Sequence, residues 1–345
     1  MVQVERLQTL IERFRDITIL VVGDVMMDEY IWGNVSRISP EAPVPVLNVV
    51  SESQKLGGAA NVIHNLCSLG GIPRICGVIG DDATGEKLKH ALQAIGVPTD
   101  SLLIDSTRPT TIKTRIIAGY HRHHQQMARL DRESQEDISP ELATHLIEHV
   151  KQVLPSINGV IIEDYGKGVV TAEIVQQIVS LAIQAGKIVA VDPKTNHFSR
   201  YNGVSVITPN HYEAGASLQM TIDNHDSLLF AGNQLLKKLE SELVLITRGE
   251  EGMSLFERQS RMVTHVPAVA QEVYDVSGAG DTVIAALTLS LAAGAEPVDA
   301  ALLSNAAAGV VVGKVGIAAV TPAELHEALA RMNRQDVTIH REKLP

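Results

Sequence analysis

Apolar and polar positions follow two patterns that alternate along most of the chain. Continuous apolar runs that end in Gly or an acidic residue, such as Ile17–Asp24, are typical of strands buried in a parallel sheet. Segments with apolar residues at helical spacing, such as Val4–Phe14, predict amphipathic helices. The same criteria predict helices over Gly57–Leu69, Ala83–Ile95, Pro140–Val153, Ala172–Ala185, Leu228–Leu239 and, near the C-terminus, Gly280–Ala292, Pro297–Val311 and Pro322–Met332. They predict strands over Arg74–Ile79, Gly159–Glu163, Ile188–Val191, Val204–Ile207 and Leu243–Thr247, with a short β segment at Gly252–Val266.

This alternation of strands and helices predicts an α/β fold. Right-handed crossover connections would place the strands in a doubly wound, mostly parallel sheet flanked by helices. Ligands of such sheets bind outside the carboxyl ends of the strands. We therefore expect the functional residues at strand ends and in the loops that follow them.

Two stretches, at about residues 29–50 and 110–132, interrupt the alternation. Both carry apolar and polar residues in turn, and the first also carries prolines, which is typical of exposed strands. We expect them to form a small β-sheet lid inserted into a single domain over residues 1–333. The remaining residues, 334–345, are expected to form a C-terminal tail.

The charge of the chain limits its partners. Its 29 Lys and Arg residues and 40 Asp and Glu residues give a formal net charge of −11. Such a chain repels nucleic acid and anionic membranes, so any phosphate site must be local. The N-terminal stretch lacks the apolar core of a signal peptide, and no apolar run reaches the roughly 20 residues that span a bilayer. We expect a cytoplasmic protein that binds neither nucleic acid nor membranes.

The most informative segment is DVSGAGDT, residues 275–282. Small residues open a predicted helix there, and Asp281 falls in its first turn. The backbone N–H groups of Gly278, Ala279 and Gly280 would form an anion hole at the positive end of the helix dipole. Asp281 would accept a proton from an attacking hydroxyl beside that hole. An acidic residue here also stabilises an ordinary helix N-terminus, so the segment alone leaves both interpretations open.

A second segment, GGAAN at residues 57–61, opens another predicted helix. Gly57 and Gly58 would let a ligand approach the backbone closely. The Asn61 amide can both donate hydrogen bonds to sugar hydroxyls and accept them. A glycine-rich helix start without any ligand is the alternative.

The segments GGAANVIHNLCSLGG (57–71) and DVSGAGDT resemble the two signatures of the ribokinase-like, or PfkB-type, carbohydrate kinases. Their order and separation also fit, and the resemblance covers the chain from about Thr18 to Pro322. It implies a ribokinase-like fold, phosphoryl transfer from ATP to a sugar, and Asp281 as the catalytic base. A sugar-binding regulator without catalytic activity is the alternative from another class, but it would lose the base or the anion hole.

The same resemblance implies a nucleotide side. TPNHYE (208–213) resembles the family's NxxE element, which implies that Glu213, with Asn210 beside it, helps to hold Mg²⁺ through water. A solvated first-turn residue is the alternative for Glu213. The resemblance further implies a nucleotide-side turn with Thr247, Arg248, Gly249 and Gly252, an adenine-side or core helix with Asn305, and K⁺ bound by backbone carbonyls around Asp275 and Val276.

A narrower resemblance concerns the substrate. GDVMMDEYIWGNVSRISPEAPVPV (23–46), EDYGKG (163–168) and QEVYDVSGAGDT (271–282) resemble kinases that act on D-glycero-β-D-manno-heptose 7-phosphate. This implies transfer to the C1 hydroxyl, giving the 1,7-bisphosphate on the way to ADP-heptose and lipopolysaccharide core. Bifunctional members carry a nucleotidyltransferase with an HxGH motif that is not found here, so adenylylation is expected from another polypeptide. Another sugar or sugar-phosphate kinase of the family is the alternative.

A phosphorylated sugar requires cations as well as hydrogen-bonding groups. The resemblance implies that Asp28 holds sugar hydroxyls, and the candidate cations for the phosphate are Arg37, Lys113, Arg115 and Lys167. Each of these cations is equally consistent with a solvated surface side chain. The family resemblance also implies a homodimer joined through the lids, whose exposed edges would pair.

Overall fold

The computed structural model describes residues 4–120, 123–269, 273–334 and 338–344. Within these residues, a ten-stranded sheet runs through the molecule in the order β14-β13-β12-β11-β10-β9-β8-β1-β4-β5. The strands from β11 to β5 pair in parallel, and β12, β13 and β14 extend the sheet in antiparallel fashion. The strand bounds are β1 (Thr18–Gly23), β4 (Ile72–Ile79), β5 (Leu102–Ile104), β8 (Gly159–Glu163), β9 (Ile188–Asp192), β10 (Val206–Ile207), β11 (Leu243–Thr247), β12 (Met253–Glu257), β13 (Met262–Val266) and β14 (His340–Lys343).

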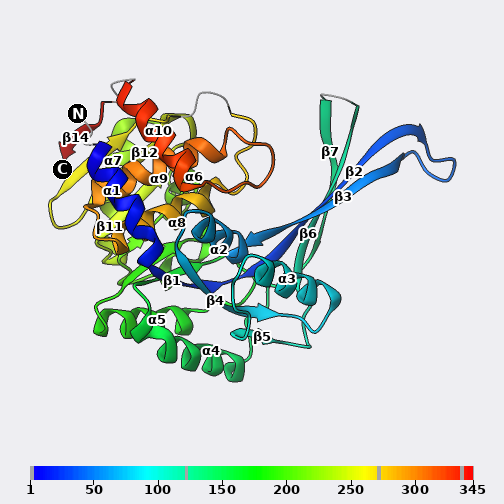
Figure 1. Cartoon of the computed structure of the whole chain (residues 1–345), viewed down its shortest axis with the longest axis horizontal. Coiled ribbons are helices and arrows are strands. Elements are labelled where there is room, and N and C mark those ends of the chain that lie inside the picture. The colour runs from blue at the N-terminus through cyan, green and yellow to red at the C-terminus, as the bar shows by residue number, and fades with distance from the viewer. Residues whose placement is uncertain (1–3, 121–122, 270–272, 335–337, 345) are drawn as a thin grey trace.

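Helices cover both faces of this sheet, and buried apolar side chains form a core against each face (Figure 1). The first core contains residues of α1 (Val4–Arg13), α2 (Ala59–Ser68), α3 (Ala83–Ala94), α8 (Ala279–Ala292), α9 (Pro297–Val311) and α10 (Pro322–Arg334). The second contains residues of α4 (Pro140–Val153), α5 (Ala172–Gln184), α6 (His211–Ser217) and α7 (His225–Leu239). Central strands such as β8 are buried along their whole length because they are covered on both sides.

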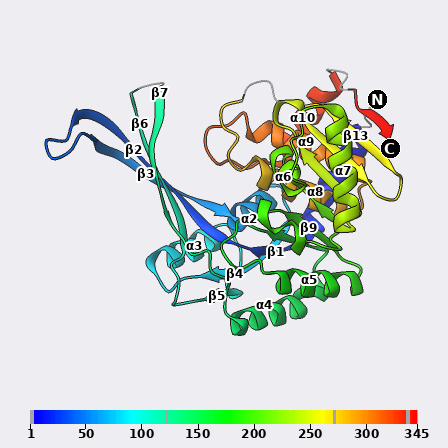
Figure 2. The same cartoon turned by 180° about the vertical axis from the view of Figure 1, so that it is seen from behind.

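A separate four-stranded sheet projects from one side of the body (Figures 1 and 2). Its order is β3-β2-β6-β7, with β2 and β6 parallel and the two outer pairs antiparallel. The bounds are β2 (Val25–Ile38), β3 (Pro45–Gly58), β6 (Thr111–Tyr120) and β7 (His123–Arg132). Only Asp24 separates the carboxyl end of β1 from β2, and β3 leads directly into α2, so the root of this lid lies at the carboxyl edge of the main sheet.

The predicted fold class is confirmed: the chain forms a mostly parallel sheet flanked by helices, with a small separate β sheet. The two interrupting stretches supply the strands of that small sheet. One difference lies at the C-terminus, where a tail was expected after residue 333 and where β14 instead pairs with β13. The buried Leu344 side chain follows this strand. Among the described residues, no helix combines the length and the apolar character needed to cross a membrane.

Candidate active site

Asp281 lies in the first turn of α8 and is almost fully buried. Its carboxylate accepts hydrogen bonds from Asn61 Nδ2 at 2.5 Å and from the Tyr165 hydroxyl at 3.0 Å. Gly278, the residue before the helix, has φ of +78°, and a β-carbon there would lie 2.8 Å from Asn61 Nδ2. A residue other than glycine at this position would therefore strain the backbone and displace the Asn61 side chain.

The two glycine-rich segments meet in the folded chain. Asn61 lies in the first turn of α2, from one segment, and Asp281 lies in the first turn of α8, from the other. A second buried bond joins the same helices, because the Thr282 hydroxyl donates to Asn65 Oδ1 at 2.8 Å. These contacts fix the carboxylate of Asp281 relative to the glycines that open α2.

The helix N-terminus offers fewer free donors than the sequence suggests. The N–H of Ala279 donates to Val276 O at 3.2 Å, so this member of the predicted anion hole has an internal partner. For the N–H groups of Gly278 and Gly280, no acceptor is found within the part of the chain that the structure describes. These two groups, with the helix dipole, remain the candidate donors for an anion.

Burial raises the pKa of Asp281 to about 6. The hydrogen bonds from Asn61 and Tyr165 oppose this rise, the negative charge of Asp28 adds to it, and the positive charge of Lys113 opposes it. A carboxylate with this pKa is mostly ionised at neutral pH and holds a proton more readily than an ordinary Asp. Such a value suits a general base that works near pH 7.

This pKa predicts an acid limit to activity. Because the base must be ionised, we expect kcat/KM for sugar phosphorylation to fall by about tenfold per pH unit below about pH 6. Asn61→Ala removes a hydrogen bond that favours the ionised form, so its acid limb should move to higher pH. The measurement is the pH profile of kcat/KM for both proteins. Identical acid limbs would contradict the assigned contact between Asn61 and the titrating group.

The lid carries three charged residues beside Asp281. Asp28 on β2 pairs in register with Lys113 on β6, and Tyr30 with Arg115, so alternate side chains place all four on one face of the lid. Arg115 Nη1 forms an ion pair with Asp28 Oδ1, and the Lys113 ammonium lies 4.8 Å from the centre of the Tyr165 ring. A β-carbon at Gly57 would overlap Asp28 Oδ2, which explains a glycine at that position.

Two predicted cations make no contact with Asp281 or Asp28 in the described part of the chain. The Lys167 ammonium pairs with Glu133 at 2.7 Å, and both side chains are largely buried. Arg37 is exposed on the distal part of β2. At about 3.3 Å per residue, it lies roughly 30 Å along the strand from Asp28. Arg37 therefore lies far from the Asp281 group of its own chain, whereas the charge of Lys167 is near enough to Lys113 to help lower the pKa of that ammonium, after the effect of burial.

Two acidic residues that the sequence reasoning did not single out complete the group. Glu163 and Asp192 end the neighbouring strands β8 and β9 in register, and their carboxylates and that of Asp281 lie within 4.8 Å of one another. Both oxygens of Glu163 are buried without a hydrogen-bond partner among the described residues. The pKa values of Glu163 and Asp192 are raised well above the usual range, first by burial and then by neighbouring carboxylates.

The sequence reasoning also did not single out Tyr165. Its position is fixed by hydrogen bonds from its loop to Asp24. Asp24 follows β1 and accepts hydrogen bonds from the backbone N–H groups of Tyr165, Lys167 and Val169 at 2.8, 3.0 and 3.2 Å. These bonds hold the loop after β8 against the root of the lid. Burial raises the pKa of Asp24 to about 6, and the charge of Asp164 adds to this. A signal was present in the sequence, because Asp24 stands at a predicted strand end.

The predicted nucleotide-side residues form a group of their own near the carboxyl ends of β10 and β11. Asn210 and Glu213 make a capping box at the start of α6, in which Glu213 Oε2 accepts from the Asn210 N–H at 2.9 Å. Burial raises the pKa of Glu213, and the charge of Lys194 opposes this. Glu213 therefore stabilises the start of α6, as the alternative interpretation of this residue as a first-turn residue proposed.

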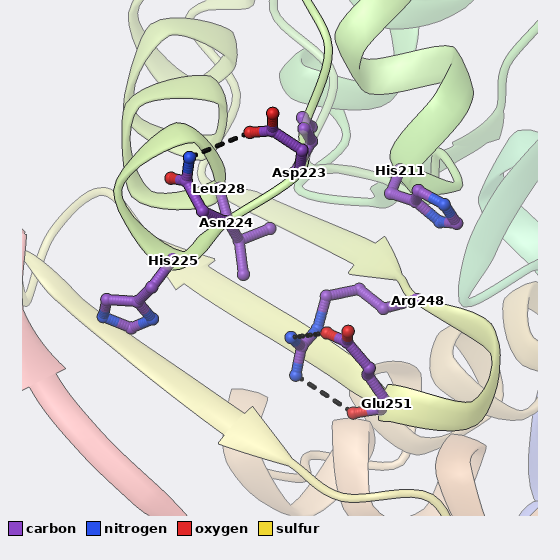
Figure 3. Close-up of a pocket in the computed structure, with 8 residues that line it drawn as sticks. His211, Asp223, Asn224, His225, Leu228, Arg248 and Glu251 are labelled. Atoms are coloured by element: carbon purple, nitrogen blue, oxygen red, sulfur yellow. Dashed lines mark hydrogen bonds and ion pairs between the residues drawn. The ribbon is translucent and has the colours of Figure 1, made fainter.

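The turn after β11 is closed by its own contacts. Thr247 bonds through its N–H to Pro209 O, which ties β11 to the start of α6. Arg248 pairs with Glu251 at 2.6 Å, and Gly249 and Gly252 take positive φ. Beside this turn lies a cavity of about 310 Å³, and Figure 3 shows Arg248 and Glu251 joined at its wall.

The predicted adenine-side helix lines a larger cavity. Ala306 and Gly309 of α9 contribute to a space of about 520 Å³, together with Val269, Tyr274 and Met332. Asn305 itself is buried, and its side-chain amide donates to Pro267 O at 2.8 Å. Asn305 therefore positions the segment after β13 and does not line the cavity.

Comparisons with known proteins identify the family of the chain. Residues 16–324 match the model of the pfkB family carbohydrate kinases. "Bifunctional protein HldE" of Pelobacter propionicus is 43% identical over 324 residues, which cover 94% of this chain and 65% of the relative. The protein of the same name from Desulfatibacillum aliphaticivorans is 46% identical over 316 residues, covering 92% and 64%. The chain thus spans just under two thirds of these relatives.

Solved structures show the same fold at low sequence identity. Arabidopsis thaliana ribokinase complexed with ribose and ATP aligns with a TM-score of 0.71 at 19% identity, covering 90% of this chain and 98% of the other. Phosphofructokinase-2 from Escherichia coli in complex with substrates and products aligns with a TM-score of 0.73 at 18% identity, covering 92% and 99%. The family match, the fold and the arrangement around Asp281 lead to one conclusion: the chain belongs to the pfkB family of carbohydrate kinases and is a sugar kinase.

Proposed function

We propose that this kinase transfers the γ-phosphoryl group of ATP to the C1 hydroxyl of D-glycero-β-D-manno-heptose 7-phosphate. The product would be the 1,7-bisphosphate, made in the cytoplasm on the way to ADP-heptose and lipopolysaccharide core. The observation that carries the proposal is the buried Asp281, held by Asn61 and Tyr165 beside the lid residues Asp28 and Lys113. The similarity to the HldE relatives and the lid segments quoted above support the choice of sugar.

The groups around Asp281 can be assigned roles in an in-line transfer. Asp28, Asn61 and the backbone at Gly57 bind sugar hydroxyls, and Asp281 takes the proton of the attacking hydroxyl. The sugar oxygen forms a bond to the γ-phosphorus as the bond to the β,γ-bridging oxygen breaks, and ADP leaves. The N–H groups of Gly278 and Gly280 stabilise the negative charge on the transferring group.

Magnesium is the divalent ion that suits the acidic group. The buried oxygens of Glu163 and the adjacent Asp192 fit a hydrated cation, because a cation would stabilise the ionised forms that burial and neighbouring carboxylates disfavour. After burial, the negative charge of Glu213 is the next cause that raises the pKa of Asp192, so we propose that Glu163, Asp192 and Glu213 hold Mg²⁺ through water. When bound, the ion neutralises phosphate charge.

A potassium site near the anion hole is a further part of the proposal. The N–H groups of Tyr274 and Asp275 donate to Val312 O at 2.8 and 3.3 Å, which anchors the loop before α8 to the end of α9. We propose that backbone carbonyls around Asp275 and Val276 bind K⁺ in this anchored loop.

Lys113 is the best-placed cation for a substrate phosphate. Arg115 is already paired with Asp28, and Lys167 with Glu133. The Lys113 ammonium makes no ion pair within the described part of the chain, and burial lowers its pKa. An anionic group bound beside it would stabilise its charged form.

The lid also suggests how two copies associate. Large apolar side chains are exposed along it, and they include Val35, Ile38, Val49, Val50 and Leu130. We propose that the lids of two chains cover one another and form a homodimer, since such a patch on a monomer would be unusual. Light scattering of the purified chain should give the mass of two copies. The mass of one copy at micromolar concentration would contradict the proposal.

A further inference from the structure

A second group of metal-ligating side chains lies at the opposite end of the sheet from the lid. It consists of His225, the first residue of α7, His265 on β13 and Glu342 on β14. Glu342 Oε1 lies 2.8 Å from His225 Nε2 and 3.0 Å from His265 Nε2. Figure 3 shows His225 at the start of α7, with its ring turned away from Asn224. None of these residues belongs to the Asp281 group.

We propose that His225, His265 and Glu342 form a zinc site that fastens the C-terminal strand to the body of the protein. Two imidazoles and one carboxylate, with water in the fourth position, are a donor set that zinc uses. Ligands at about 2.0–2.1 Å from a tetrahedral zinc ion lie about 3.4 Å apart. The ligand atoms here lie within 4.8 Å of one another, so small side-chain rotations suffice to bring all three onto one ion.

The surroundings of His265 support the proposal. Its Nδ1 lies 2.8 Å from the Ser254 hydroxyl on β12, which leaves Nε2 directed at Glu342. A hydrogen bond at the second ring nitrogen is what fixes the tautomer of a metal-binding histidine, and a hydroxyl can donate or accept as the tautomer requires. His265 is therefore held in a ligand-ready orientation by a buried residue.

The position in the fold gives the site a role. β14 is the outermost strand of the sheet and pairs only with β13 in the described chain. His340 precedes Glu342 by two residues on the same face, and its Nδ1 lies 3.9 Å from Glu342 Oε1. This third imidazole is near enough to take the fourth position after rotation. A metal here would link three elements that are distant in sequence and would reduce opening of the edge strand.

Zinc titration of the whole chain by calorimetry, after treatment with a chelator, tests the proposal. We expect the unmodified chain to bind one Zn²⁺. In both His225→Gln and Glu342→Gln, the Kd for this ion should increase at least tenfold. Ser254→Ala should weaken binding by about tenfold, as loss of a supporting hydrogen bond does at other metal sites. Zinc should also raise Tm and slow hydrogen exchange in β14 of the unmodified chain, and do neither in His225→Gln.

The matched control is His326→Gln. His326 lies 3.4 Å from Glu12 Oε1, so it makes the same type of pair with a single carboxylate and no second imidazole. It should leave zinc binding unchanged. Equal zinc affinity in the unmodified chain and in His225→Gln, or an equal loss in His326→Gln, would overturn the proposal. In those cases the contacts would be hydrogen bonds from two imidazoles to one carboxylate. The readouts do not require kinase activity.

Discussion

Asp281→Asn is expected to lower kcat by about 10²–10⁴-fold, the usual contribution of a positioned general base. The substitution keeps the size and shape of the side chain and removes only its ability to take a proton. Asn61 can still donate to the amide oxygen, and the amide nitrogen can donate to the Tyr165 hydroxyl, so the local contacts survive. The measurement is steady-state kcat with saturating sugar phosphate and ATP.

A second variant separates the base from a helix-start role. Asp226 lies in the first turn of α7, is exposed, and belongs to no part of the active-site group. Asp226→Asn should leave kcat within about twofold, while any loss of helix stability is comparable to that of other first-turn carboxylates. A near-normal kcat in Asp281→Asn would contradict the proposed mechanism and would return Asp281 to the role of a helix-stabilising residue.

Lys113→Met is expected to cause the second-largest loss, and only for a phosphorylated sugar. A hydrogen bond between charged groups contributes about 1.5–3 kcal/mol, so kcat/KM for heptose 7-phosphate should fall by roughly 10–100-fold. Most of the change should appear in KM, because the ammonium contacts a part of the substrate that does not react. The value for unphosphorylated heptose should change little. Methionine is similar in length to lysine and removes the charge that lies over the Tyr165 ring.

The control for this prediction is Lys237→Met, which removes an exposed cation on α7, outside the lid. Lys237→Met should leave kcat/KM unchanged for both heptose and heptose 7-phosphate. Equal losses for heptose and heptose 7-phosphate in Lys113→Met would mean that Lys113 supports the lid or the charge of Asp281. The assignment of Lys113 to the substrate phosphate would then be wrong.

The two segments that carry the proposed chemistry were recognisable because each is continuous in sequence. The glycines and small residues around Asp281 and Asn61 predict helix starts that a ligand can approach. In the structure these two residues are in contact. The parallel sheet followed from the alternation of apolar runs and helical spacing. Both inferences use only local sequence and the rules of βα connection.

The residues that were missed depend on pairing between distant strands. Glu163 and Asp192 lie side by side only because β8 and β9 are neighbours in register. Tyr165 reaches Asp281 because Asp24, which is far away in sequence, holds the intervening loop. No local pattern shows which strands are neighbours. Acidic residues at successive strand ends were nevertheless a signal that these positions could meet.

The candidate cations show the same limit. The sequence offered no basis for separating Arg37, Lys113 and Arg115, whereas the register of β2 and β6 places Lys113 and Arg115 beside Asp28. Arg37 lies far from Asp28 because β2 is long. Lys167 forms an ion pair with Glu133. The polar strand β14 gave no alternating apolar signal, so its place in the sheet depends on pairing with β13.

The most direct test of the account is ADP release by the purified chain with Mg-ATP and four sugars: heptose 7-phosphate, heptose, fructose 6-phosphate and ribose. The account predicts a clear preference for heptose 7-phosphate over heptose, with a product phosphorylated at both C1 and C7. A preference for fructose 6-phosphate or ribose would contradict the proposed substrate and leave a sugar kinase with Asp281 as its base.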